Sequence, residues 1–242
     1  MPQPTAHFVR TALALLVAGA GCSTDLLMPD PPGGGENVAM TKLQGDEQIG
    51  TVGEPLPTPL VVQVLTPRSQ PAAGRKVVFD LTGDPAAGEV DPDTAITNDE
   101  GQAAARWVLG TAPGAHVVVA RLVGGEAENQ VAEFRAAARP AAPDTLRPAS
   151  ALAQPGRRKE EVVNSPVVHV VDRYGNPVEN VAVAWQVTAG EGQVQEPITT
   201  TDAEGNASAH WILGDRLGLH KLTAAIGNVR GSPVTFTATV LF

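Results

Sequence analysis

Apolar residues recur at every second position in several short runs of this chain, which is the period of a β-strand with one buried face. Val77, Phe79 and Leu81, for example, alternate with Val78, Asp80 and polar neighbours. In the first half of the chain the pattern predicts strands near residues 38–43, 60–66, 76–82, 102–109, 114–122 and 130–137.

The second half of the chain shows the same alternation in the same order. Gly (25 residues) and Pro (21 residues) separate the runs and follow no collagen-like period, so they indicate turns between short strands. Predicted strands in this half cover residues 166–171, 181–187, 206–213, 219–226 and 233–240.

The two halves contain one repeated motif. A turn of the form Thr-Asn/Asp-x-Glu-Gly at residues 97–101 and 201–205 is followed by Trp-x-Leu-Gly at residues 107–110 and 211–214. A period of about a hundred residues, found once and repeated once, indicates two copies of one domain. We place the first domain at residues 38–138, a Pro-rich joint at 139–143 and the second domain at 144–242.

The pattern predicts an all-β fold made of two tandem β-sandwiches. The aromatic residues share a face with aliphatic neighbours, so we assign them to the two cores. An alternative use of Trp107 and Trp211 is as exposed platforms on which sugars stack. The aromatic residues assigned to the cores are Phe79, Trp107 and Phe134 in the first copy, and Trp185, Trp211 and Phe236 in the second.

The N-terminal segment has the composition of a secretory signal. Arg10 precedes an apolar stretch at residues 11–21, and small residues lead directly to Cys22, the single cysteine of the chain. This order resembles the bacterial lipoprotein signal, in which the cysteine becomes a lipid-modified N-terminus. The sequence therefore predicts a signal peptide at 1–21 and lipidation at Cys22, with an ordinary secretory signal as the alternative.

Residues 22–37 contain the run PDPPGGG and predict a flexible tether, because Pro removes backbone donors and Gly adds conformational freedom. Fully extended, the tether reaches at most about 50 Å, which is enough to lift a domain clear of lipid headgroups. These features predict a partner membrane that is reached through the lipid, and a position in the bacterial envelope at the outer membrane or the cell surface.

Charge and cysteine content exclude some functions. The formal net charge is −9, and nucleic-acid binding requires a basic face, so we expect no nucleic-acid partner. With one cysteine, neither domain can contain an internal disulfide, and each must be stable through packing alone.

The second copy resembles a known family. Residues 172–178 (DRYGNPV), 181–185 (VAVAW) and 201–207 (TDAEGNA) are similar to the bacterial immunoglobulin-like (Ig-like) domains of the invasin and intimin group. The first copy departs from this pattern at residues 66–72 (TPRSQPA). The resemblance implies antiparallel Ig-like sandwiches, and it does not imply a ligand.

Candidate chemistry is sparse. His116 and His220 hold matching positions but fall in different domains, so we interpret them as structural histidines near strand starts. His169 and His210 have no counterpart, and no motif for a metal, cofactor or nucleophile is present. The acidic turns could supply oxygen ligands for calcium, although such residues usually cap the backbone. These turns contain Asp91, Asp93, Asp99, Glu100, Asp202 and Glu204.

One basic run, Arg157 to Lys159, precedes Glu160 and Glu161, and we interpret it as a self-neutralised solvated surface. Three functions stay open. The first is a non-enzymatic, lipid-anchored envelope protein that binds an unknown protein or glycan or acts as a spacer. The second is a secreted carbohydrate-binding or adhesion module with an exposed tryptophan. The third is an enzyme with a cleft between domains, which the sequence disfavours.

Overall fold

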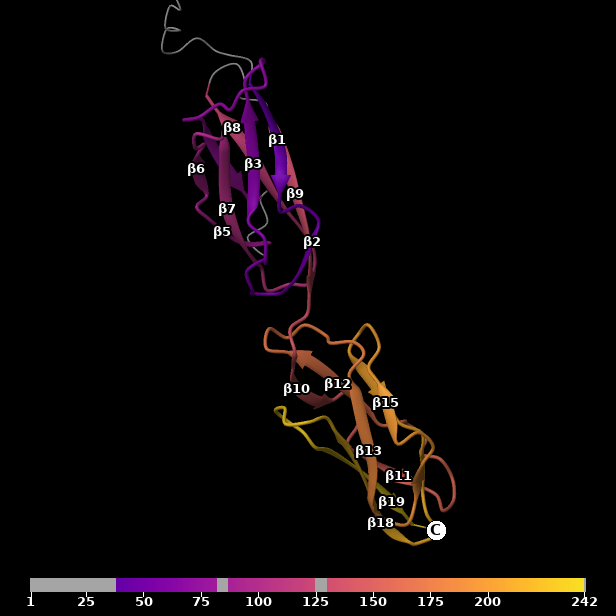
Figure 1. Cartoon of the computed structure of the whole chain (residues 1–242). Coiled ribbons are helices and arrows are strands. Elements are labelled where there is room, and N and C mark those ends of the chain that lie inside the picture. Colours follow the sequence, from indigo (N-terminus) through magenta and orange to yellow (C-terminus); the bar gives the residue numbers. More distant parts are fainter. Residues whose placement is uncertain (1–37, 82–86, 125–129, 242) are drawn as a thin grey trace, which may run out of the picture. The chain divides into compact units, whose positions relative to one another are not determined.

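A computed structural model describes residues 38–81, 87–124 and 130–241, and these residues form two β-sandwiches that follow each other along the chain (Figure 1). No α-helix occurs among the described residues, so the all-β prediction is confirmed. The signal-like segment, Cys22 and the tether lie outside the described residues.

The first sandwich consists of a four-stranded sheet in the order β1-β3-β7-β5 and a five-stranded sheet in the order β2-β9-β8-β4-β6. The strands are β1 (Ala39–Gln44), β2 (Gln48–Thr51), β3 (Leu60–Leu65), β4 (Lys76–Asp80), β5 (Gly88–Asp91), β6 (Thr94–Ile96), β7 (Gln102–Leu109), β8 (Gly114–Val123) and β9 (Val131–Arg139).

The second sandwich repeats this order. The sheet β11-β19-β18-β13-β15 corresponds to β2-β9-β8-β4-β6, and β10-β12-β16 with the pair β14-β17 corresponds to β1-β3-β7-β5. The strands are β10 (Pro143–Pro148), β11 (Ala153–Gly156), β12 (Val167–Asp172), β13 (Ala182–Ala189), β14 (Gln193–Val194), β15 (Ile198–Thr200), β16 (Asn206–Ser208), β17 (Trp211–Ile212), β18 (Gly218–Ala225) and β19 (Val234–Val240).

Each sandwich contains one parallel strand pair, β2 with β9 and β11 with β19. The sequence pattern did not predict β2 and β11, because they are short and carry Gly or Pro instead of alternating apolar residues. Each short strand contains a glutamine whose side chain forms hydrogen bonds with the backbone of the segment that follows the strand. Gln48 bonds both backbone groups of Thr58 (2.8 and 3.0 Å), and Gln154 bonds both of Asn164 (2.7 and 3.1 Å).

The strand predicted at residues 206–213 is wrong as one element. It divides into β16 and β17 at Ala209 and His210, which belong to neither strand. β16 pairs with β12, whereas β17 pairs with β14. Between them, the N–H of Ala209 donates to the carbonyl of Pro166 (3.0 Å), and the carbonyl of His210 accepts from Gln195 (3.1 Å).

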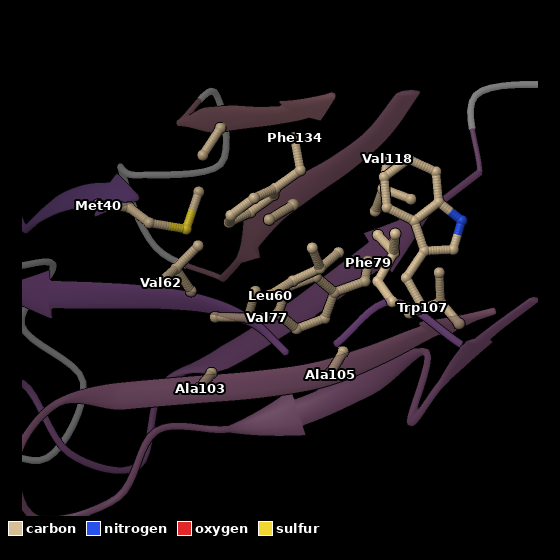
Figure 2. Close-up of a cluster of buried hydrophobic side chains, with 14 of the residues drawn as sticks. Met40, Leu60, Val62, Val77, Phe79, Ala103, Ala105, Trp107, Val118 and Phe134 are labelled. Carbon is tan, nitrogen blue, oxygen red and sulfur yellow. The ribbon is translucent and has the colours of Figure 1, made fainter. Parts of the chain in front are cut away.

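The core of the first sandwich lies between its two sheets. Figure 2 shows the side chains of Phe79, Phe134 and Trp107 among aliphatic residues from facing strands. The indole N–H of Trp107 donates to the carbonyl of Ala87 at 3.1 Å, so this large ring is buried with its one polar atom satisfied.

The second core has the same plan around Trp185, Trp211 and Phe236. The rings of Trp185 and Phe236 are tilted by 38° with their centroids 6.2 Å apart. Trp185 donates its indole N–H to the hydroxyl of Thr199 at 2.8 Å.

One turn recurs between the sheets of each sandwich. In the first, the buried hydroxyl of Thr97 donates to the carbonyl of Ala72 (2.6 Å) and accepts from the N–H of Arg75 (2.9 Å). Thr201 does the same with Val178 (2.7 Å) and Val181 (2.9 Å) in the second. The repeated Thr of the sequence motif therefore links the end of β6 to the loop before β4 in the first sandwich, and the end of β15 to the loop before β13 in the second.

Candidate functional site

The three tryptophans are buried, with exposed fractions of 1% for Trp107, 4% for Trp185 and 0% for Trp211. A sugar-stacking platform requires a ring face in contact with solvent. None of these rings is placed for that role, and each one fills space between the sheets. Phe79, Phe134 and Phe236 are buried in the same way.

His116 and His220 are also buried, one in each sandwich. In both, the Nε2–H donates to the carbonyl of the residue four positions earlier, Ala112 or Arg216, at 2.9 Å. The Nδ1 atoms have no hydrogen-bond partner among the described residues. The two imidazoles fix the loop before β8 and the loop before β18, and they belong to separate cores.

In the acidic turns, side-chain oxygens accept hydrogen bonds from backbone N–H groups of the same turn. The Oδ1 atom of Asn98 accepts from the N–H groups of Glu100 (3.1 Å) and Gln102 (2.8 Å), and Oδ1 of Asp202 accepts from the N–H of Asn206 (2.8 Å). Within the described ranges, no three His, Cys, Asp or Glu side chains gather as a metal site would require.

The basic run at residues 157–159 is paired differently from the prediction. Lys159 and Arg158 approach Asp215 at 3.1 and 3.9 Å, and Glu161 instead contacts His210 at 2.7 Å. The run is solvent-exposed as predicted, but its ion pairs are with Asp215 in the turn before β18 and not with the neighbouring glutamates.

Asp172 is the most heavily hydrogen-bonded carboxylate among the described residues, and it begins the DRYGNPV motif. Its oxygens accept from the N–H groups of Tyr174 (2.8 Å) and Asn176 (2.9 Å) and from the side-chain amide of Asn176 (2.9 Å). A further bond comes from the N–H of Ala141 at 3.0 Å. The side chain of Asp172 is 2% exposed, so these donors replace its water.

Two effects act on the pKa of Asp172 in opposite directions. Burial raises the pKa, because it disfavours the charged form. The hydrogen bonds from the Asn176 side chain and from the N–H groups of Ala141, Asn176 and Tyr174 lower it. The bonds outweigh burial, and the pKa of Asp172 lies below its ordinary value.

The contact with Ala141 gives Asp172 a role at the joint. Only residues 140–142 separate β9 from β10. The carbonyl of Arg139, the last residue of β9, accepts from Val52 (3.0 Å), and the side chain of Ala141 packs against the first core. The residues on both sides of the joint therefore form hydrogen bonds. Sequence reasoning gave this motif a family likeness and missed its contact with the joint.

A polar groove of about 490 Å³ lies in the second sandwich, where β15 ends one sheet and β16 ends the other. Each terminal strand has one backbone edge that no strand pairs with. Side chains able to donate or accept hydrogen bonds surround this edge. The groove is lined by Glu196, Ile198, Thr200, Asp202, Ser208 and His210, among others.

Sequence reasoning missed this groove, which we call the edge groove. Its residues come from two separate runs, 196–202 and 206–210, and their meeting depends on the chain crossing from one sheet to the other. The corresponding part of the first sandwich has a smaller groove of about 310 Å³, lined by Asp91, Ala104 and Arg106 among others.

These features define a protein with two Ig-like sandwiches in tandem. Residues 162–239 match the family model of the bacterial Ig-like domain (group 1). This match covers most of the second domain, and the predicted resemblance to the invasin and intimin group is confirmed. None of the curated proteins is a significant match to the chain in sequence.

Solved structures similar to this chain include a bacterial adhesin. The Escherichia coli adhesin FdeC is 16% identical, with 85% of this chain and 65% of that chain covered and a TM-score of 0.51. Yersinia pseudotuberculosis InvD is 15% identical (84% and 57% covered, TM-score 0.47). The D0-D1 domain of intimin is 17% identical (84% and 98% covered, TM-score 0.33). This chain thus spans less than two thirds of FdeC and InvD, and the likeness to FdeC shows the fold alone.

None of the described residues forms a helix with the length and apolar character that crossing a bilayer requires.

Replacing Asp172 with Ala should destabilise the second domain by about 1–3 kcal/mol at pH 7, because it leaves three partly buried N–H groups without an acceptor. The contribution of Asp172 is complete above its unfolded pKa of about 3.9 and is lost as the pH falls through the lower folded value. Urea unfolding of wild type and Asp172→Ala at pH 7 and pH 3 measures both effects.

The exposed cap Asp202 offers a matched control, and Asp202→Ala should cost about 0.5–1 kcal/mol at pH 7. A difference in unfolding free energy between wild type and Asp172→Ala that stays constant from pH 7 to pH 3 would contradict the assigned role.

Proposed function

We propose that the protein is a non-enzymatic, lipid-anchored module of the bacterial cell envelope that presents a binding surface on its tandem Ig-like domains. The position of Cys22 supports the anchor, since the single cysteine follows an apolar segment of signal length and a run of small residues. The Pro/Gly-rich tether at residues 22–37 separates this anchor from the first sandwich.

The edge groove carries the binding part of the proposal. Unpaired edges of two sheets face a shared space, and an extended segment of a partner can add backbone hydrogen bonds there. Glu196, Asp202 and His210 supply polar contacts that would select the partner. The chemistry favours an extended polar segment of a protein, or a glycan that offers hydroxyl groups.

The joint supports a spacer role. A link of three residues, in which Ala141 donates its N–H to Asp172, keeps the two domains adjacent along the chain. Adhesins such as FdeC share this kind of fold, which agrees with a surface-binding protein. The buried tryptophans disfavour the alternative in which an exposed indole binds carbohydrate.

The anchor predicts a simple partition experiment. The wild-type protein, expressed in a bacterium that processes lipoproteins, should enter the detergent phase of a two-phase extraction, and Cys22→Ser should enter the aqueous phase. Metabolic labelling with a palmitate analogue should mark only the wild type. A wild-type protein that stays unlabelled and aqueous would remove the anchor from the proposal.

The edge groove predicts a second experiment. Ser208 is exposed within the groove, so Ser208→Arg should fill it without disturbing the core. Capture of an envelope component on immobilised protein should fall at least tenfold, which corresponds to about 1.4 kcal/mol. Thr235→Arg is the matched control, because Thr235 is exposed on β19 outside the groove. Equal capture by both variants would place the binding surface elsewhere.

A further inference from the structure

The outer surface of the sheet β11-β19-β18 carries an apolar patch at one end. Leu219 is paired with Thr239, and Thr239 is paired on its other side with Pro155, so these three residues form one row across the sheet. Leu241 lies two residues beyond Thr239, diagonal to Leu219 and on the same surface. Leu217 continues this surface from the β18 side.

The leucines are well exposed, with 60% for Leu217, 51% for Leu219 and 60% for Leu241. Beside them, Leu241 and Pro155 share a groove of about 400 Å³ with Val163, which is 88% exposed. We call these five residues the leucine patch. Neighbouring exposed apolar residues of this size mark interaction surfaces more often than isolated ones do.

The first sandwich provides an internal comparison. The pairing of Gly114 with Ala138 corresponds to that of Gly218 with Val240. By this register, the positions of Leu217, Leu219 and Leu241 are occupied in the first sandwich by Pro113, Ala115 and Arg139. The fold therefore does not require leucine at these positions, and the patch is a property of the second domain.

The charges at the rim of the patch have both signs. Arg157 and Glu160 line the same groove as Leu241, and neither side chain forms an ion pair within the described part of the chain. The neighbouring cations Arg158 and Lys159 are occupied by Asp215. A surface with one unpaired cation and one unpaired anion beside an apolar centre is complementary to itself.

Because the leucine patch is complementary to itself, the partner that fits it is a second copy of the chain. A two-fold axis through the patch would place Arg157 of each copy opposite Glu160 of the other, forming two equivalent ion pairs. The two copies would pack face to face instead of extending a sheet, because Pro155 lacks a backbone N–H on the edge strand β11.

We propose that the leucine patch is a homodimer interface, with the leucines at its centre and the Arg157–Glu160 pairs at its rim. Five apolar side chains form a small interface, so the dimer is weak, with a Kd on the order of 100 µM. On a membrane, anchored chains are confined to one surface, and a weak contact is sufficient to pair them. This inference does not depend on the edge groove or its partner.

Sedimentation velocity on the full chain with Cys22→Ser, from micromolar to millimolar concentration, tests the proposal. We expect a shift from monomer to dimer across this range. Leu241→Ser and Leu219→Ser should each raise the Kd by about tenfold. Ile198→Ser removes an apolar side chain that is 64% exposed outside the patch, and it should leave the Kd unchanged.

The rim charges give a rescue test that a change in folding cannot imitate. Arg157→Glu and Glu160→Arg should each weaken the dimer, and the double variant should restore it, because the exchanged charges again face each other. A chain that stays monomeric at millimolar concentration overturns the proposal. So does association that persists unchanged in Leu241→Ser, which would place the contact elsewhere, for example in the apolar segment at residues 11–21.

Discussion

Each sandwich depends on one buried threonine hydroxyl that ties strands of the two sheets together. In the second domain, Val178 donates its N–H to Val170 in one sheet (3.1 Å), and its carbonyl accepts from Thr201 (2.7 Å), which follows β15 in the other sheet. Four residues later, Gly205 has a φ of 73°, and a Cβ there would lie 2.6 Å from the carbonyl oxygen of Val170. The turn therefore requires Thr and Gly at fixed spacing, which explains why this motif repeats. With a single cysteine in the chain, no disulfide connects the sheets.

Much of this architecture could be predicted from the sequence, because alternation and the repeat report local and periodic constraints. Phe79 and Trp107 alternate with solvated residues, so their burial follows from strand geometry. The short strands β2 and β11 could not be found in this way, because they are defined by parallel pairing with β9 and β19. These partners are the last strands of each domain in the sequence. The role of Asp172 at the joint and the edge groove depend on tertiary contacts, which leave no local period in the sequence.

The two domains share one plan and differ where function is expected. At the end of its sheets, the first domain carries Pro113, Ala115 and Arg139 and continues into a short joint, whereas the second carries leucines. The second domain also has the larger edge groove. The features on which the proposed contacts rest, the leucines and the larger groove, therefore both belong to the second domain. Binding surfaces on such a scaffold can change without disturbing the core, because exposed side chains such as Ser208 and Leu241 lie outside it.

The most direct test of this account is the unfolding free energy of Thr201→Val. Valine has nearly the same shape and no hydroxyl, so the substitution leaves the N–H of Val181 and the carbonyl of Val178 without their partner. We predict a loss of about 2–4 kcal/mol by urea unfolding, against less than about 0.5 kcal/mol for the exposed Thr235→Val. Equal small losses for the two variants would show that the sheets are held together without this turn, and would contradict the account.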